Sequence, residues 1–404
     1  MAEATGERQR GLAHALRWTV LGVAMFVAAC ASGPRIVPEP SRPAPAPIPR
    51  ERPIDRPIAP GLPQDLQRHR VALLVPLTGP NGGVGKSLAN ATQLAILDTK
   101  SDVIRITTYD TASPGGAAAA AKQAIADGNQ LILGPLLAEE ARQVAPLARA
   151  ARVPVLSFSN DTSVAGGGTY LLGYSPAQSM ERVVNYARTS GITQFAGLVP
   201  AGVYGERVST SFLRAVESGG GTVVALETYD SRPGSLAGAI TKAGRSPFQA
   251  ILFAGTGGGA VAAVPLIRKS PGGKTAKLLG TDQWNSDSSI GANAALSGAW
   301  FASVPNNLYR QYAVKYRDRF GVAPYRLSTM GYDAVLLTVR IAREWRPGDT
   351  FPERRLSQAD GFAGLDGAFR FGRDGVAQRA LEVQEIRGGT TTTVSPAPAN
   401  FDGN

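Results

Sequence analysis

From Val71 onward, short apolar runs alternate with alanine-rich segments of helical character, and this alternation restricts the fold more than any other feature of the chain. The predicted strands are 71–77, 103–109, 131–133, 153–158, 195–199, 222–226, 250–254, 277–279 and 300–304, and the clearest helices are 116–126, 139–150 and 179–190. Strands rich in Val, Ile and Leu with helices between them form parallel sheets that are covered on both faces. The sequence therefore predicts an α/β fold.

The pattern restarts near Gln178, and the chain that carries it is longer than one typical α/β domain. We expect two doubly wound lobes with parallel sheets, joined by crossover strands and with a cleft between them. Residues 70–177 with about 306–345 are assigned to lobe I, and residues 178–305 with about 346–389 to lobe II. A hairpin around Asp374-Gly375 is expected to close the fold, and residues 390–404 are expected to form a disordered polar tail.

Residues 1–29 have the pattern of a bacterial lipoprotein signal peptide. A basic segment precedes an apolar stretch of 12 residues, Trp18 to Ala29, which is shorter than the about 20 residues of a membrane span. Cys30 follows Val27-Ala28-Ala29, as in a lipobox, and is the predicted lipidation site; the alternative is a plain signal peptide with an incidental cysteine. Because Ala31 permits outer-membrane sorting, we expect a lipid-anchored protein on the periplasmic face of the outer membrane.

Residues 30–69 form the predicted lipidated cysteine and proline-rich linker, with 11 prolines between positions 31 and 63. In an extended polyproline II conformation, at about 3.1 Å per residue, this segment would reach roughly 100 Å. It is either a spacer of periplasmic scale or an ordinary stalk that holds the domain away from the membrane.

The chain is nearly devoid of the side chains that most hydrolytic and metal chemistry needs. Cys30 is the only cysteine, and the two histidines are His14 in the predicted signal and His69, which we expect to be a solvated flank of the first strand. Cys-His, Ser-His-Asp and zinc-hydrolase sites are therefore excluded. We predict that the protein is not an enzyme and has no catalytic residues, no metal site and no cofactor.

Two glycine-rich segments fall short of nucleotide-binding motifs. Gly85-Lys86-Ser87 follows a strand, but Pro80 occupies the position where a phosphate loop needs glycine. The stretch 255–260 fits Gly-x-Gly-x-x-Ala but lacks the acidic residue expected about 20 positions later. The net charge of +11 is spread without Lys/Arg blocks, which suits attraction to anionic surfaces and gives no support for nucleic acid binding.

Polar and aromatic residues gather where the predicted strands end. In parallel sheets these carboxyl ends face the ligand crevice. The candidate cleft residues are Thr78, Asn81, Ser157, Ser159, Asn160, Tyr204, Thr256, Asp282 and Trp284. Each of them has the alternative of belonging to a structural turn.

Four segments in combination resemble type I periplasmic binding proteins, the leucine/isoleucine/valine-binding group. They are the opening strand and loop at 71–80, the Gly-Pro turn at 131–135, the strand at 152–159 and the final hairpin at 367–375. The resemblance covers roughly 71–388 and implies two α/β lobes with a closing cleft. It also implies that Ser157, Ser159 and Tyr204 match positions that contact ligand.

Within that group, the segment 134–140 and the lipoprotein start look more like penicillin-binding-protein activators, outer-membrane lipoproteins that stimulate peptidoglycan synthases. Amino-acid-binding members place a serine shortly after the Gly-Pro turn, but here Leu136-Leu137-Ala138 offers no hydroxyl to a ligand carboxylate. The resemblance thus implies a regulator of cell-wall synthesis whose partner is a peptidoglycan synthase. The alternative is a substrate-binding lipoprotein that delivers an amino-acid-like ligand to an ABC permease.

Overall fold

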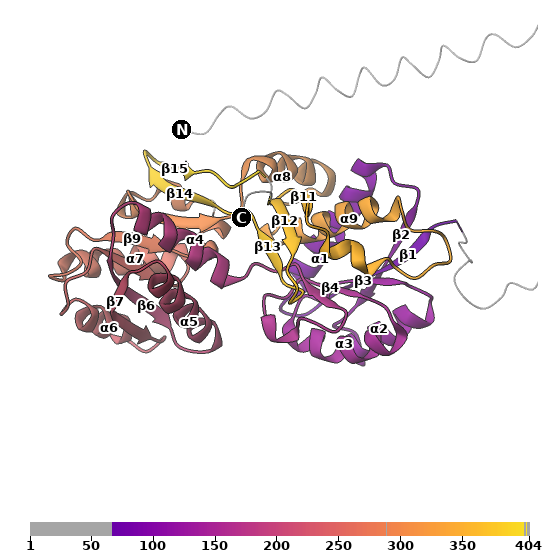
Figure 1. Ribbon diagram of the computed structural model, residues 1–404, viewed down its shortest axis with the longest axis horizontal. Helices are drawn as coiled ribbons and strands as arrows, with labels where there is room; N and C mark the ends of the chain where they lie inside the picture. The colour runs from indigo at the N-terminus through magenta and orange to yellow at the C-terminus, as the bar shows by residue number, and fades with distance from the viewer. Residues whose placement is uncertain (1–66, 288, 400, 402–404) are drawn as a thin grey trace, which may run out of the picture. The chain divides into compact units, whose positions relative to one another are not determined.

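The computed structural model describes residues 67–287, 289–399 and 401. The predicted signal peptide, Cys30 and nearly all of the predicted linker lie outside this part of the chain. The described residues form two α/β lobes, each built on a mainly parallel sheet (Figure 1), as the sequence predicted.

The sheet of lobe I has five parallel strands in the order β2-β1-β3-β4-β5. The strands are β1 (His69–Val75), β2 (Ile104–Asp110), β3 (Leu131–Leu133), β4 (Val155–Ser157) and β5 (Thr169–Leu171). The helices that share buried clusters with it are α1 (Gly82–Thr99), α2 (Gly116–Ala126), α3 (Ala138–Ala151), α8 (Asn307–Phe320) and α9 (Thr329–Ala342).

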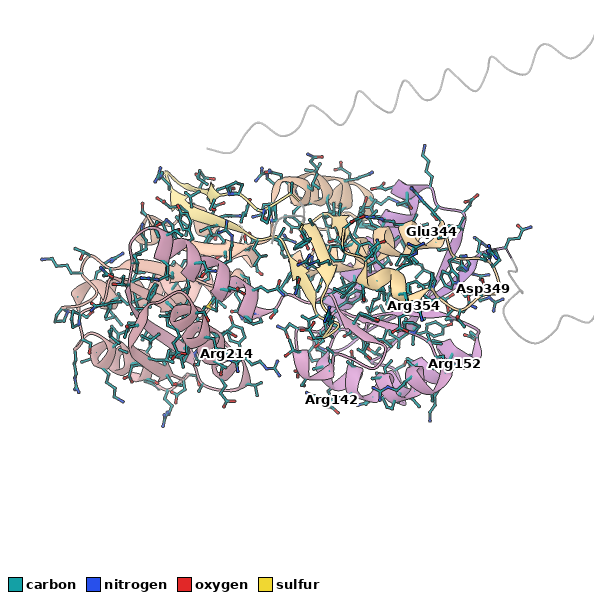
Figure 2. All side chains as sticks on the ribbon, in the orientation of Figure 1. Arg142, Arg152, Arg214, Glu344, Asp349 and Arg354 are labelled. Atoms are coloured by element: carbon teal, nitrogen blue, oxygen red, sulfur yellow. The ribbon has the colours of Figure 1, made fainter. Side chains whose placement is uncertain are left out.

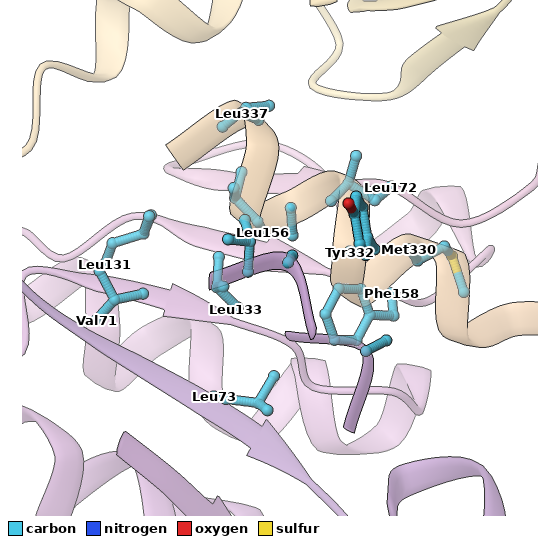
Figure 3. Close-up of a cluster of buried hydrophobic side chains, with 14 of the residues drawn as sticks. Val71, Leu73, Leu131, Leu133, Leu156, Phe158, Leu172, Met330, Tyr332 and Leu337 are labelled. Carbon is cyan, nitrogen blue, oxygen red and sulfur yellow. The ribbon is translucent and has the colours of Figure 1, made fainter. Parts of the chain in front are cut away.

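Strand β1 shows why this sheet needs a continuous apolar run. Val71, Leu73 and Val75 join one buried cluster with α1 and α9, part of which is drawn in Figure 3, whereas Ala72 and Leu74 join a second cluster with α2 and α3. None of the five has exposed surface. Since burial of one large aliphatic side chain stabilises a fold by roughly 1.5–3 kcal/mol, both faces of the strand contribute to the core.

The sheet of lobe II has seven strands in the order β15-β14-β10-β9-β8-β6-β7. The five from β10 to β7 are parallel, whereas β14 pairs antiparallel with β10 and β15 antiparallel with β14. The strands are β6 (Gln194–Pro200), β7 (Thr222–Tyr229), β8 (Ala250–Phe253), β9 (Lys277–Gly280), β10 (Trp300–Ser303), β14 (Glu382–Arg387) and β15 (Thr390–Ser395). The helices are α4 (Pro176–Thr189), α5 (Val203–Ser218), α6 (Ser235–Ala243) and α7 (Gly257–Lys269).

The chain passes between the two lobes three times. Strand β5 leads into α4, whose Met180 and Val183 belong to a buried cluster of lobe II. Strand β10 leads into α8, whose Tyr312 belongs to the main cluster of lobe I. The third passage joins the short sheet described next to β14.

The segment before β14 differs from the prediction. Residues 346–389 were assigned to lobe II, but β11 (Phe362–Gly364), β12 (Gly367–Phe371) and β13 (Ala377–Arg379) form a separate antiparallel sheet. Its phenylalanines join the main buried cluster of lobe I, together with Trp345 and Phe351. The aromatic side chains therefore fix this segment to lobe I, and only β14 returns to lobe II.

Two further expectations differ from the structure. Thr390–Ser395 form strand β15 instead of a disordered tail, because a run of β-branched threonines pairs with β14. His69 is only 4% exposed instead of solvated. Its ring stacks on Trp345 at a centroid distance of 3.8 Å, and its Nε2 lies 2.9 Å from the Trp345 carbonyl oxygen.

The glycine-rich segment at the start of α1 is explained by packing. A Cβ atom on Gly85 would lie 1.7 Å from the carbonyl oxygen of Pro76, so only glycine lets the helix approach the end of β1 this closely. Gly205 in α5 has the same relation to Pro200, at 1.6 Å. Ser87 is buried and accepts a hydrogen bond from the backbone N–H of Tyr325 at 3.1 Å.

Candidate functional site

A cavity of about 390 Å³ is lined by residues from both lobes. Those at or after the carboxyl ends of parallel strands are Asn81, Leu136, Leu137, Phe158 and Asn160 in lobe I and Tyr204, Asp282, Gln283, Ser303 and Val304 in lobe II. This is the position at which open α/β sheets bind ligands. The volume lies within the range of about 300–1,000 Å³ that small-molecule sites occupy.

Four of the predicted cleft residues line this cavity: Asn81, Asn160, Tyr204 and Asp282. Asn81 precedes the first turn of α1, and Asn160 lies in the loop after β4. The hydroxyl of Tyr204 donates to Thr281 Oγ1 at 3.4 Å. Burial, and then the nearby Asp282 carboxylate, raise the pKa of Tyr204, so this side chain stays a neutral hydrogen-bonding group.

The Asp282 carboxyl is desolvated at the cavity. Its Oδ1 is buried and has no hydrogen-bond partner among the described residues. Burial raises the pKa of Asp282 to about 6, in spite of a hydrogen bond from its own backbone N–H. A buried acceptor left unpaired costs about 1–3 kcal/mol, so a ligand that donates a hydrogen bond here would relieve a real penalty.

Ser157 and Ser159 do not line the cavity, in contrast to the prediction. The Ser157 hydroxyl donates to the carbonyl of Pro135 at 3.0 Å and accepts from the backbone N–H of Ser159 at 3.1 Å. The Ser159 hydroxyl accepts from the backbone N–H of Asp161 at 3.1 Å. Both hydroxyls are buried and hold the loop after β4 in shape.

The other three predicted residues also lie outside the cavity lining. Thr78 is exposed in the loop after β1. Thr256 caps α7 by accepting a hydrogen bond from the backbone N–H of Gly259 at 3.2 Å. Trp284 has no exposed surface, belongs to a buried cluster of lobe II and donates to the carbonyl of Gly255 at 3.0 Å.

Two buried arginines that the sequence analysis did not identify also line the cavity, and Arg326 is the first of them. It is 8% exposed, and its Nη1 donates to Asp366 Oδ1 at 2.8 Å. Asp366 has no exposed surface and also accepts from the hydroxyls of Tyr174, at 2.5 Å, and Thr329, at 2.7 Å. Burial alone would raise the pKa of Asp366, but the charges of Arg326 and then Arg379 hold it below its usual value.

Arg379, at the end of β13, is the second buried arginine and is 7% exposed. Its Nη2 donates to the carbonyl of Leu172 at 2.7 Å, while its Nη1 lies 3.9 Å from Asp333 Oδ2, beyond hydrogen-bonding distance. Burial, and then the charge of Asp366, raise the pKa of Asp333. Arg379 therefore has a weaker carboxylate partner than Arg326.

A carboxylate at the edge of the cleft is held from both lobes. Asp161 accepts from Arg142 on α3 of lobe I at 2.7 Å (Figure 2 labels Arg142) and pairs with Arg207 on α5 of lobe II at 2.8 Å. Burial alone would raise the pKa of Asp161, but hydrogen bonds from Ser163 and Arg207 lower it to about 2. The contact with Arg207 links the two lobes directly.

The part of the chain that the structure describes offers no helix with both the length and the apolar character needed to cross a membrane. Within the same residues, no group of three or more His, Cys, Asp or Glu side chains is arranged to hold a metal ion.

Comparisons with known proteins agree with the geometry. A putative branched-chain amino acid ABC transporter protein of Rhodospirillum rubrum is 19% identical, with a TM-score of 0.71 over 81% of this chain and 100% of that chain. The C-domain of LpoA from Haemophilus influenzae, described as a regulator of PBP1A, is 19% identical, with a TM-score of 0.63 over 80% of this chain and 99% of that chain. At this identity the likeness shows the fold alone.

An uncharacterised protein of Rickettsia prowazekii is 24% identical over 170 residues, which are 42% of this chain and 46% of that protein. The chain thus matches less than half the length of this curated relative. The model of a family described as periplasmic binding protein matches residues 69–391. This is a family of ligand-binding, non-enzymatic proteins, in agreement with the prediction that the protein is not an enzyme. The chain belongs to the periplasmic binding protein family.

Proposed function

We propose that the domain is a receptor that binds a small polar solute in the cavity between its two lobes. The observation that carries this proposal is that one cavity is lined by Asp282 of lobe II and by Arg326 and Arg379 of the segments packed on lobe I, and that each of these side chains has buried polar atoms without a hydrogen-bond partner among the described residues. Unpaired buried polar groups destabilise a fold, and they persist where a ligand satisfies them. An ABC permease that takes up an amino-acid-like solute is the partner that fits such a receptor, and the likeness to the Rhodospirillum rubrum protein supports it.

Solute binding is tested by the thermal stability of the full chain, purified in detergent and followed by its intrinsic tryptophan fluorescence. A solute that binds only the folded state raises the melting temperature, by a free energy of about 2.7 kcal/mol at a concentration of 100 times Kd. A small-molecule extract of the source cells should therefore raise the melting temperature. A variant with the cavity filled, Ser303→Phe, should lose that rise, because Ser303 is 1% exposed and lines the cavity. An extract that leaves the wild-type protein unshifted contradicts the proposal.

A second function, regulation of a peptidoglycan synthase, is favoured by two observations. The LpoA C-domain superposes on 80% of this chain, and Leu136 and Leu137 line the cavity where a hydroxyl would hold an amino-acid carboxylate. The test adds the full chain to a purified penicillin-binding protein from the same cells and measures transglycosylase and transpeptidase rates. Unchanged rates would exclude this function and leave solute binding as the role of the domain.

We also propose that Cys30 carries the lipid that anchors the protein to the periplasmic face of the outer membrane, with the proline-rich linker as tether. The sequence before Cys30 supports this, and the family is consistent with a periplasmic location. Metabolic labelling with a palmitate analogue should mark the wild-type protein and not the Cys30→Ser variant. Labelled protein should sediment with the outer membrane; recovery in the inner-membrane fraction would refute the sorting, and equal labelling of both variants would refute the anchor.

A further inference from the structure

A second groove lies beside the cavity, along helix α8. It has a volume of about 750 Å³, and its walls include α8 and the loop after it and, from lobe II, the 3₁₀ helix η3 (Ile290–Ala292) and the start of β15. The groove meets the cavity at four shared residues, Asn285, Ser286, Arg326 and Leu327. Its other residues lie outside the cavity lining, so most of the groove is a separate surface.

Two exposed arginines of α8, Arg310 and Arg317, line this groove. The guanidinium of Arg310 donates to Asn307 Oδ1 at 2.7 Å. Lys315 on the same helix is paired with Asp98, whereas neither Arg310 nor Arg317 has a carboxylate partner among the described residues. Both guanidiniums can therefore donate to a carboxylate of another molecule.

The groove carries an excess of positive charge. Asp287 is the one acid among the described residues that line it, and its Oδ1 accepts from the backbone N–H of Ser289 at 2.9 Å and from the Ser289 hydroxyl at 2.6 Å. Arg326, which also lines the groove, is paired with the buried Asp366. Arg310 and Arg317 thus set the sign of the charge in the groove, and charge complementarity selects an acidic occupant.

The spacing of the two arginines limits the conformation of that occupant. They are seven residues apart in α8, which places them about 10.5 Å apart along the helix axis. In a polyproline II helix, with three residues per turn and a rise of about 3.1 Å per residue, side chains three residues apart lie on one face at a distance of about 9 Å. Two turns of an α-helix would match the spacing too, but they occupy roughly 800–1,200 Å³, which is more than the volume of the groove.

Aromatic rings in the groove favour the same conformation. Tyr309 and Tyr325 line it, and Tyr325 is 52% exposed. Polyproline II segments dock in grooves lined by aromatic side chains, because their preformed backbone loses little conformational entropy on binding. The proline-rich segment of this chain does not fit the charge, since residues 31–63 contain five arginines and three acids. The occupant that fits is a segment of another protein.

We infer that the groove along α8 docks a polyproline II segment of a partner protein, in which two acidic side chains three residues apart meet Arg310 and Arg317. The inference does not depend on the proposed solute binding, because neither arginine lines the cavity. An anionic membrane surface has the right charge, but it is flat on this scale and does not enter a concave groove.

The test measures binding of fluorescent peptides to the full chain in detergent, by fluorescence polarisation. The probe is a short polyproline peptide in which two prolines, three positions apart, are replaced by glutamate. It should bind between about twofold and about thirtyfold more tightly than the same peptide with glutamine at both positions, since each exposed ion pair contributes a factor of about five at most. A third peptide with two adjacent glutamates has the same charge and should bind more weakly than the probe.

Three variants separate these contacts from the general charge of the protein. Arg310→Gln and Arg317→Gln should each reduce the preference for glutamate over glutamine. Arg319→Gln is the matched control, because Arg319 is exposed on the same helix and lies outside the groove lining, so it removes the same charge and should keep the preference. All three side chains are exposed, and an unchanged melting temperature verifies that each variant is folded.

Several results would overturn the inference. It fails if the glutamate and glutamine peptides bind equally, if the adjacent glutamates bind as tightly as the spaced pair, or if Arg319→Gln loses as much preference as Arg317→Gln. It also fails if the peptides show no difference while phosphatidylglycerol vesicles sediment the Cys30→Ser chain in a manner that requires Arg310 and Arg317, because the surface is then a membrane contact. None of these results bears on solute binding, which is measured separately by the melting temperature.

Discussion

Replacing Asp366 with asparagine should destabilise the domain strongly, because the change removes the charge that Arg326 needs. Asp366 has no exposed surface, and its three short hydrogen bonds come from Arg326, Tyr174 and Thr329. Asparagine keeps the shape of the side chain but loses the charge and one acceptor oxygen. Removing one partner of a buried ion pair costs about 3–5 kcal/mol, a large fraction of the about 5–15 kcal/mol that stabilises a typical fold.

The assay is urea-induced unfolding, followed by tryptophan fluorescence and circular dichroism. Asp349→Asn is the control, because this aspartate is exposed (Figure 2 labels it) and its side chain should matter by less than about 0.5 kcal/mol. The double variant Asp366→Asn with Arg326→Met should lose less stability than the two single variants added together, since the Arg326 charge is then no longer buried without its partner. A loss of less than about 1 kcal/mol in Asp366→Asn would refute the ion pair as a determinant of stability.

Three other contacts can be tested in the same way. Arg207→Gln should shift the protein toward an open arrangement of the lobes, because it removes the ion pair between Asp161 and lobe II. X-ray scattering should then give a larger radius of gyration. Arg142→Gln removes only the contact within lobe I and should leave the radius of gyration unchanged. Asp282→Asn should raise the free energy of unfolding by about 1–2 kcal/mol near about pH 7 and leave it unchanged below about pH 4. The pKa of Asp282 is higher in the folded than in the unfolded state, so the wild type loses stability as the pH rises between these two pKa values, and asparagine does not. An equal rise in melting temperature at both pH values would contradict this. Gly85→Ala should lower the melting temperature sharply, because its Cβ would lie 1.7 Å from a backbone oxygen, and an unchanged value would show that α1 does not pack this closely.

The two lobes could be predicted because the apolar runs that form their strands are visible in short stretches of the sequence. A strand covered on both faces must be apolar at every position, and this is visible in a window of a few residues around Val71 or Phe195. Strand β5 escaped the prediction because Thr169–Leu171 are only three residues and follow three glycines. Its place at the sheet edge comes from pairing with β4, which a short window does not contain.

The assignment of the C-terminal segment failed for a different reason. Alternation around Phe369 and Phe371 predicts strands, and β12 and β13 do form an antiparallel pair there. The same alternation says nothing about which hydrophobic surface those rings join. They pack with Trp345 and the core of lobe I, and this choice depends on contacts between residues far apart in the sequence.

In the candidate site, too, local sequence patterns predict some residues, whereas others depend on contacts between distant parts of the chain. Residues after parallel strands, such as Asn81, Tyr204 and Asp282, line the cavity because sheet geometry places them there. Ser157 also lies at the end of a strand, but its hydroxyl donates a hydrogen bond to the carbonyl of Pro135. A polar residue at a strand end therefore indicates where the cleft lies, but not whether that side chain is free to contact a ligand.

Arg326 and Arg379 could not be found by this rule, because Arg326 lies between helices α8 and α9 and Arg379 at the end of a short antiparallel strand. In the sequence they look like any of the 42 Lys and Arg residues, most of which are expected at the surface. Arg326 is buried only because it meets Asp366, 40 residues away. Several of their N–H groups lack a hydrogen-bond partner among the described residues, and such an absence is defined only once the fold has brought the other groups into place. A sequence pattern can therefore identify strand ends that line the cavity, but the buried charges beside them are recognisable only in the packed structure.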